Sequence, residues 1–230
     1  MPLTIGITHC DEWTNYQRWF KSFDPSMVIV RLKKGVILPE QAKLCDGIVL
    51  SGGEDVDPSY YNKSEYTEQF GLKDINKERD EYEFEIIKEV EANAIPLLGI
   101  CRGLQIVNVF HKGTLIADLP SIEKKCHAEK DKDANHEVKL DVNSQIFKIT
   151  GEGRGITNSH HHQSVDGIGQ GLIATAFSED GVIEGIEKEN TNSFFLLVQW
   201  HPERMDPSNP FSGKLREAFV KACSKQTITV

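Results

Sequence analysis

The stretch 97–108, LLGICRGLQIVN, constrains the fold more than any other part of the chain. The apolar run 95–100 predicts a short buried strand, and a helix is predicted to follow it. Cys101 lies between the two, with Gly99 and Gly103 two residues to either side. A strand, a sharp turn and a helix around a nucleophilic residue flanked by glycines form a nucleophile elbow.

An elbow would place Cys101 in a strained conformation with its side chain exposed above the sheet edge. Glycines are needed nearby because larger side chains would collide in so sharp a turn. The N–H groups at the start of the helix would favour the thiolate of Cys101. The alternative is a core cysteine behind a strand, since cysteine is among the most buried residue types.

The first half of the chain alternates strands and helices. Strands are predicted at 3–8, 27–32, 47–50 and 95–100, and helices at 16–23, 39–44 and 79–91. Asp80 and Glu83 have capping-box spacing near the start of the last helix, and an earlier start of that helix is the alternative. Residues 60–76 are predicted to form a loop over the site around Cys101. This alternation predicts an α/β fold with a parallel sheet covered on both faces.

Short strands follow one another closely in the second half. They are predicted at 138–140, 173–177, 182–187 and 194–200, and Glu179-Asp180-Gly181 is a hairpin signal between the middle pair. This part of the sheet is therefore predicted to be antiparallel or mixed. An amphipathic helix is predicted over 211–223. The sequence contains no repeat or linker, so the whole chain, 1–230, is predicted to be one domain.

Two further motifs come at predicted strand ends. Ser51-Gly52-Gly53 leaves the strand 47–50, where ligands bind in open α/β sheets, and the backbone N–H of Gly53 is a candidate oxyanion-hole donor. The alternative is an ordinary glycine-rich turn. His201-Pro202-Glu203 ends the last strong strand, so in extended backbone His201 and Glu203 would project to the same side. The alternative there is a surface turn.

These residues together predict cysteine-dependent acyl chemistry. Cys101 would attack an acyl carbon as thiolate, His201 would accept and donate the proton, and Glu203 would orient His201. The N–H groups of Gly53 and Arg102 would stabilise the tetrahedral oxyanion.

The eight histidines raise the question of a metal site. His127, His136 and the run 160–162 are candidates, but the sequence has no C-x-x-C, no H-E-x-x-H and no evident carboxylate grouping at ligand spacing. We therefore expect neither a metal nor a cofactor.

Composition limits the partners. The formal net charge of −9, from 26 basic and 35 acidic residues, argues against nucleic acid, and the longest apolar runs are far shorter than a membrane span. The chain opens with what reads as a first strand rather than a signal segment. Five cysteines, an odd number without paired spacing, favour a reduced, cytoplasmic compartment.

At this point the chain resembles a known family. Six segments in order are similar to the class I glutamine amidotransferase-like hydrolases, and within them to the γ-glutamyl-γ-aminobutyrate hydrolase-like branch, also called peptidase C26. They are SGGEDVDPSYY at 51–61, RDEYE at 79–83, GICRGLQIVNV at 99–109, GTLIADLP at 113–120, NSHHHQSV at 158–165, and GVIEGIE with VQWHPE at 181–187 and 198–203.

The resemblance implies a flavodoxin-like three-layer sandwich, a Cys-His-Glu triad and a γ-glutamyl substrate. It places Gln105 and the turn of Ser159, His160 and His161 near the α-amino and α-carboxylate ends of that substrate, and residues 54–61 near the leaving amine. A homodimer is a family-level expectation. The resemblance assigns no role to His162 and Gln163.

The chain departs from the family pattern at three places. Lys112 replaces the first glycine of the usual Gly-Gly-Thr-Leu, Ala117 replaces the usual Gln before Asp118, and 20–36 lacks the usual glycine-rich turn. The triad residues are all present, so these departures bear on the particular amine released rather than on the chemistry.

Three functions fit these residues. The first is a stand-alone hydrolase that cleaves a γ-glutamyl amide to glutamate and an amine, favoured because the chain has no room for a synthetase domain. The second is a glutaminase subunit that supplies ammonia to a separate synthetase partner. The third is a non-catalytic binding protein on the same fold, which loss of a triad residue would mark.

Overall fold

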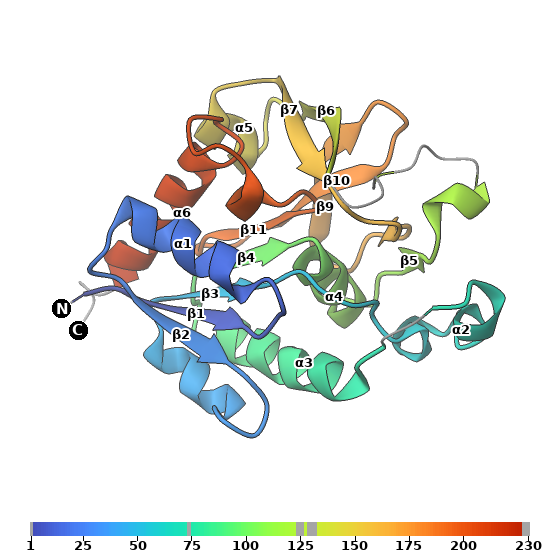
Figure 1. The fold of residues 1–230 in the computed structure, drawn as a ribbon, viewed down its shortest axis with the longest axis horizontal. Helices are drawn as coiled ribbons and strands as arrows, with labels where there is room; N and C mark the ends of the chain where they lie inside the picture. The colour runs from blue at the N-terminus through green and yellow to red at the C-terminus, as the bar shows by residue number, and fades with distance from the viewer. Residues whose placement is uncertain (1, 73–74, 123–126, 128–132, 227–230) are drawn as a thin grey trace.

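A mixed sheet runs through the middle of the molecule (Figure 1). The computed structural model describes residues 2–72, 75–122, 127 and 133–226. Within these, nine strands pair in the order β2-β1-β3-β4-β11-β10-β9-β6-β7. Five neighbours are parallel: β2 (Val28–Leu32), β1 (Thr4–Thr8), β3 (Gly47–Leu50), β4 (Leu97–Ile100) and β11 (Phe195–Val198).

The sheet continues beyond β11 as an antiparallel extension. Its strands are β10 (Ile183–Lys188), β9 (Leu172–Ser178), β6 (Ala134–Leu140) and β7 (Arg154–Ser159). The predicted hairpin at 179–181 joins β9 to β10. A separate antiparallel pair is formed by β5 (Leu115–Ile116) and β8 (Ser164–Val165). The predicted mixed character of this half is confirmed.

Helices cover both faces of the sheet, which confirms the three-layer α/β prediction. One face carries α1 (Trp13–Phe23), α5 (Gln145–Thr150) and α6 (Gly213–Gln226). The other carries the 3₁₀ helix η1 (Pro39–Leu44), α3 (Lys77–Ala92) and α4 (Arg102–Phe110). Shorter helices are η2 (Pro58–Tyr61), α2 (Tyr66–Gln69), η3 (Leu119–Ile122) and η4 (Pro202–Arg204).

Each helical layer packs on the sheet through apolar side chains. On the first face Phe20 and Phe219 pack with ring centroids 5.9 Å apart, and Leu215 and Phe219 of α6 are fully buried. On the second face Ile86 of α3 and Leu104 of α4 are fully buried against the strands. Among the described residues, no helix is both long and apolar enough to cross a membrane.

Several local predictions were wrong. The loop predicted over 60–76 contains α2 and the end of η2, and α5 and β7 were not predicted at all. The predicted turn of Ser159, His160 and His161 begins on the last residue of β7. Asp80 and Glu83 do not cap α3, because the side chain of Asn76 accepts the cap hydrogen bond from the N–H of Arg79 at 3.0 Å.

Lys112 has a backbone conformation that favours glycine. It directly follows the C-cap of α4, with a φ of 71°. A side chain in this left-handed region costs about 1–2 kcal/mol. The departure from the glycine usual at this position is therefore a local strain at an exposed turn, and it leaves the elbow itself unchanged.

We expect Lys112→Gly to stabilise the protein by about 0.5–1 kcal/mol, since relief of the left-handed strain exceeds the flexibility that glycine adds to the unfolded chain. Urea denaturation measures the change. The control is Lys139→Gly on β6, an exposed strand position where glycine should cost about 0.5–1 kcal/mol. Equal losses in both variants would contradict the assignment of strain to Lys112.

Candidate active site

The predicted elbow is present between β4 and α4. Cys101 is the N-cap residue of α4 and has φ 54° and ψ −106°, a strained conformation for a residue with a side chain. Gly103 is required by close packing, because a Cβ there would lie 2.2 Å from the carbonyl oxygen of Leu50 on β3. The thiol is less exposed than predicted: Cys101 is only 6% exposed and lies at the base of a cavity.

His201 and Glu203 are brought together at the end of β11. The Nδ1 of His201 donates to the Oε1 of Glu203 over 2.8 Å. The contact was predicted, but its reason was wrong: Pro202 begins the 3₁₀ helix η4, so the backbone is not extended there. The turn is anchored from behind, where the Oγ of Ser212 donates to the carbonyl of Pro202 at 2.7 Å and accepts from the indole N–H of Trp19 at 3.0 Å.

The protonated form of His201 is favoured by its neighbours. Burial opposes protonation, but the Glu203 carboxylate and the hydrogen-bonded Cys101 outweigh it and raise the pKa of His201 to about 10. Its backbone N–H donates to the Oδ1 of Asn158 at 3.0 Å, which holds the backbone of His201 against β7. An imidazolium stabilises a thiolate beside it. The imidazole is thus hydrogen-bonded to the Glu203 carboxylate and lines the same cavity as Cys101.

The loop after β3 faces Cys101 and His201. A Cβ on Gly52 would lie 2.9 Å from the Cε1 of His201 and 3.7 Å from the Cβ of Cys101, so the backbone of the loop passes directly beside the triad. The N–H of Gly52 donates to the hydroxyl of Tyr16 at 2.9 Å. Gly53 has φ 146° and lines the same cavity as Cys101. Gly53 and Cys101 thus line one cavity, and the role of the Gly53 N–H as an oxyanion donor stays a prediction.

A buried network of four charged side chains supports both the loop and the elbow. The guanidinium of Arg102 contacts Asp80 and Glu83, and all three side chains are at most 1% exposed. Arg79 donates to the Oε1 of Glu83 at 2.9 Å and to the carbonyl of Gly52 at 2.9 Å. Burial alone would raise the pKa of Glu83, but Arg102 and Arg79 outweigh it and lower that pKa. The network therefore ties the residue after the nucleophile to the oxyanion loop.

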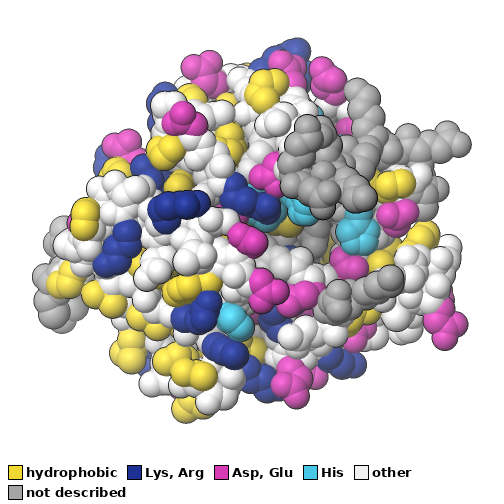
Figure 2. All heavy atoms as spheres, viewed as in Figure 1, with side chains coloured by type: hydrophobic (Ala, Val, Ile, Leu, Met, Phe, Trp, Pro, Cys, Tyr) yellow, Lys and Arg dark blue, Asp and Glu magenta, His cyan; other side chains and the backbone are white. Residues whose placement is uncertain are grey.

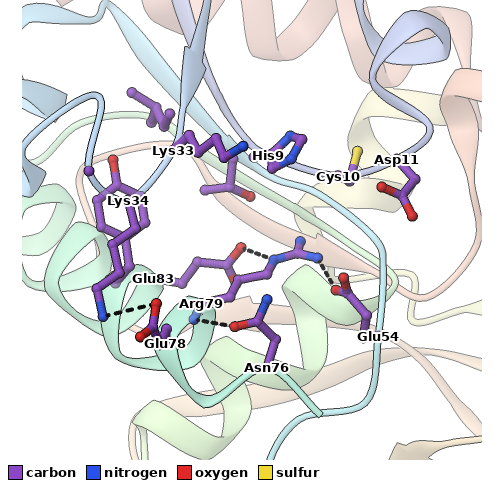
Figure 3. Close-up of a pocket in the computed structure, with 14 residues that line it drawn as sticks. His9, Cys10, Asp11, Lys33, Lys34, Glu54, Asn76, Glu78, Arg79 and Glu83 are labelled. Carbon is purple, nitrogen blue, oxygen red and sulfur yellow. Dashed lines mark hydrogen bonds and ion pairs between the residues drawn. The ribbon is translucent and has the colours of Figure 1, made fainter. Parts of the chain in front are cut away.

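The active-site cavity has a volume of about 300 Å³. Its lining includes five of the predicted site residues: Gly53, Cys101, His160, His201 and Glu203. A second cavity of about 520 Å³ adjoins it and shares Cys10, Asp11 and Glu54 with it. Figure 3 shows this second cavity, with Arg79 between Glu83 and Glu54 on one side and Lys33 and His9 across from them.

Three predicted substrate-binding residues do not line the active-site cavity. Gln105 is buried behind the elbow, where its amide donates to the carbonyl of Gln163 and to the side chain of Gln199, each at 3.2 Å. The Oγ of Ser159 donates to the carbonyl of His127 at 2.6 Å. His161 is 5% exposed and faces Glu184. Their roles in substrate binding stay predictions.

Sequence reasoning missed Tyr16 in this site. The ring of Tyr16 is part of the core, and its hydroxyl accepts from the N–H of Gly52. The sequence pattern indicates only that Tyr16 lies on the apolar side of α1. Burial raises the pKa of Tyr16 well above its usual value, which keeps the hydroxyl neutral. Sequence reasoning also missed the contacts of His162. Its Nε2 lies 3.0 Å from Asp55, and its Nδ1 lies 3.5 Å from Asp118.

The metal argument from spacing overlooked one grouping. His127, His136 and Glu184 offer ligand atoms that lie within 4.8 Å of one another. They come from three separated segments, so no short motif in the sequence could have shown them. Cys126, beside this group in the sequence, lies outside the described residues, and the four described cysteines are free.

We expect Glu83→Gln to destabilise the protein by about 3 kcal/mol or more, because it removes a buried charge that holds two guanidinium groups. Chemical denaturation measures the loss. The control is Glu85→Gln, which removes half of an exposed ion pair with Lys88 and should cost less than about 0.5 kcal/mol. A loss as small as the control's would show that the network contributes nothing to stability.

We expect Glu203→Gln to lower the pKa of His201 by about one unit or more, because the variant removes the carboxylate that favours the imidazolium. The raised pKa means that protonated His201 stabilises the wild type fully below pH 6.5, and that this stability is lost as the pH rises through about 10. NMR titration of the His201 ring, assigned with His201→Gln, gives both pKa values. The control Glu12→Gln removes a charge elsewhere in the cavity wall and should leave the titration unchanged. An unshifted titration in Glu203→Gln would contradict the role of Glu203.

The chain is similar to known proteins over most of its length. The family model for peptidase C26 matches residues 15–203. The γ-glutamyl-γ-aminobutyrate hydrolase of Escherichia coli K12 is 30% identical over 187 residues, which cover 77% of this chain and 72% of that protein. A glutamine amidotransferase-like protein of Rickettsia prowazekii is 32% identical over 237 residues, 81% of this chain and 83% of that protein.

Solved structures show the same fold at low identity. A GMP synthase protein of Thermoplasma acidophilum has a TM-score of 0.69 at 16% identity, covering 99% of this chain and 96% of that one. The glutaminase domain of Trypanosoma brucei CTPS, with bound acivicin, has a TM-score of 0.66 at 16% identity and covers 97% and 94%. The chain belongs to the peptidase C26 family of hydrolases.

Proposed function

We propose that this protein hydrolyses a γ-glutamyl amide to glutamate and an amine through a thioester on Cys101. The observation that carries the proposal is the His201–Glu203 hydrogen bond in the wall of the cavity that Cys101 also lines. The likeness to the E. coli γ-glutamyl-γ-aminobutyrate hydrolase supports the γ-glutamyl part of the substrate.

In this mechanism the sulfur of Cys101 attacks the γ-carbonyl carbon as thiolate. The N–H groups of Gly53 and Arg102 donate to the oxyanion, at roughly 3–4 kcal/mol per donor. His201 gives its proton to the amine nitrogen as the C–N bond breaks and the thioester forms. Water then attacks the thioester and His201 takes one proton of that water. The C–S bond breaks, which restores the thiolate and imidazolium, and the new γ-carboxyl group loses the other proton to solvent as glutamate leaves.

The second cavity favours an amine larger than ammonia. The active-site cavity of about 300 Å³ has room for a γ-glutamyl group, and the adjoining space of about 520 Å³ would take the leaving amine. A glutaminase releases only ammonia and has no use for that space. Basic and acidic side chains are interspersed with histidine near the middle of this face of the molecule (Figure 2), which suits a polar amine.

The alternative is a glutaminase subunit that passes ammonia to a synthetase. It uses the same triad and the same γ-glutamyl group, so the site chemistry does not separate the two. The second cavity supports the conjugate hydrolase, since only that function needs room for the amine. A non-catalytic binding protein is disfavoured because all three triad residues are in place.

The test is glutamate release from glutamine, γ-glutamyl-aminobutyrate, other γ-glutamyl amines and γ-glutamyl dipeptides. We expect strong release from one class of conjugate, poor release from glutamine, and a loss of at least about 10³-fold in Cys101→Ala. The control is Cys45→Ala, because burial raises the pKa of Cys45 to about 11 and keeps it a thiol. Full activity in Cys101→Ala would overturn the mechanism, and release from glutamine alone would favour the glutaminase alternative.

A further inference from the structure

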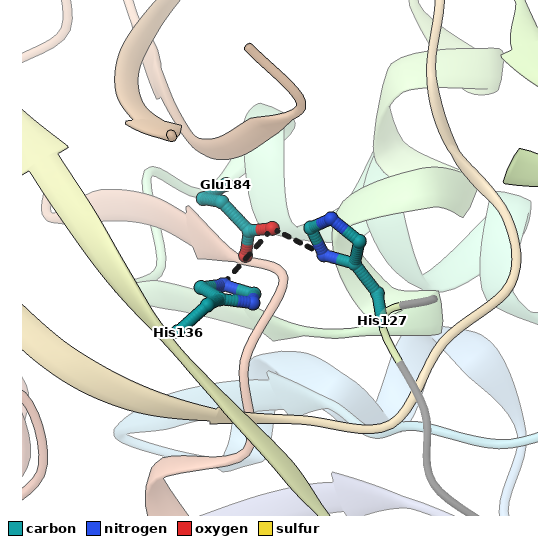
Figure 4. A group of neighbouring side chains, drawn as sticks. All are labelled: His127, His136 and Glu184. Carbon is teal, nitrogen blue, oxygen red and sulfur yellow. Dashed lines mark ion pairs between the residues drawn. The ribbon is translucent and has the colours of Figure 1, made fainter. Parts of the chain in front are cut away.

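A second group of side chains converges next to the active site, at the same edge of the sheet. We propose that His127, His136, His161 and Glu184 form a structural zinc site. Figure 4 shows three of them, with the rings of His127 and His136 turned toward the carboxylate of Glu184 from two sides. Glu184 lies on β10 and His136 on β6, while His127 and His161 pair with each other in an isolated bridge.

The distances from one carboxylate oxygen of Glu184 are those of a tetrahedral metal site, and the ligand atoms of His127, His136 and Glu184 all lie within 4.8 Å of one another. Nitrogen and oxygen ligands about 2.0–2.1 Å from zinc are about 3.3 Å from one another in a tetrahedron. The Oε1 of Glu184 lies 3.2 Å from the Nδ1 of His127, 3.3 Å from the Nε2 of His136 and 3.5 Å from the Nε2 of His161. One carboxylate oxygen thus lies at a tetrahedral ligand spacing from three imidazole nitrogens.

The contacts have the distance of hydrogen bonds but not their direction. Glu184 is fully buried, His127 is 3% exposed and His161 is 5% exposed. Yet none of the three ring nitrogens, nor either oxygen of Glu184, makes a hydrogen bond of proper geometry with any residue that the structure describes. Buried polar atoms without partners are costly. Lone pairs that point to a common centre, rather than at one another, are what metal ligands require.

The outer atoms of two rings are held as they are in metal sites. A histidine ligand donates its other ring N–H to a carbonyl or a carboxylate, which fixes the ring and its tautomer. The Nδ1 of His161 lies 2.9 Å from the carbonyl of Gln163, and the Nε2 of His127 lies 3.2 Å from a carboxylate oxygen of Asp180. In both rings the nitrogen that faces Glu184 is then the one free to bind a metal.

The ligand set selects the metal. Three imidazoles and one carboxylate suit zinc, and four protein ligands without an open position are typical of a structural site rather than a catalytic one. A bound zinc would hold in place the strands that form the wall of the active site. The backbone carbonyl of Glu184 accepts from the N–H of Gln199, two residues before His201, and Asn158 of β7, which pairs with the β6 strand of His136, accepts from the N–H of His201.

The test is zinc binding by the full chain after removal of metal with a chelator. The competing occupant is the triad itself, because a thiolate and an imidazole also bind zinc. Every protein therefore carries Cys101→Ser. Zinc is titrated against a chromophoric chelator, bound zinc is counted by mass spectrometry, and cobalt is added separately to report tetrahedral geometry from its visible absorption.

We expect one zinc per chain, a rise in melting temperature that saturates at one equivalent, and at least about tenfold weaker binding in both His136→Ala and Glu184→Gln. His136 is partly exposed, so its variant keeps the test valid where Glu184→Gln does not fold. The control His111→Ala removes a histidine elsewhere, paired with Glu91, and should bind as its parent does.

Three results would overturn the proposal. The first is no zinc binding once Cys101 is replaced, which would assign any binding to the triad. The second is equal binding in His136→Ala, which would mean adventitious binding elsewhere. The third is loss of stability in Glu184→Gln with no response of the parent protein to zinc, which would make the cluster a metal-free hydrogen-bond network.

Discussion

The active site depends on one buried set of charges. Arg102 directly follows the nucleophile, and its side chain points away from the cavity into Asp80 and Glu83 of α3. Arg79, one turn before Glu83, carries the same network to the carbonyl of Gly52 in the oxyanion loop. Charges taken out of water are tolerated only when fully paired. The network therefore permits one relative position of elbow, loop and helix, which is what an oxyanion hole built from two separate backbone segments needs.

The mixed sheet gathers everything functional at one edge. The ends of parallel β3, β4 and β11 supply the oxyanion loop, Cys101 and His201, and these strands are neighbours. The antiparallel extension adds a second support, because β7 delivers Asn158 to the backbone of His201 while β10 hydrogen-bonds to the residues just before it. The triad is held from the parallel side by a charge network and from the antiparallel side by the strands that carry the histidine cluster.

Local patterns predicted the elbow, most of the strands and helices of the first half, and the contact of His201 with Glu203, but not α2, α5 or β7. The glycines around Cys101, the alternation of strands and helices, and the two-residue spacing of His201 and Glu203 each carry their signal within a few residues. The misses required tertiary information. Asp80 and Glu83 look like cap residues until Arg102 is known to lie above them, and Tyr16 looks like core until its hydroxyl is seen to meet the N–H of Gly52. The histidine cluster draws on three segments, so spacing within the sequence could not disclose it.

The electrostatics of His201 bear on the kind of amide that the proposed reaction would cleave. An imidazole with a pKa of about 10 holds its proton through the attack of the sulfur and is a weak acid toward a neutral amide nitrogen. When the tetrahedral intermediate forms, that nitrogen becomes basic, and the thiolate that had favoured the imidazolium is consumed. Loss of this partner lowers the pKa of His201 at the moment when the leaving amine needs a proton. The proton transfer is thus timed by the covalent step, and it suits leaving groups as basic as alkyl amines.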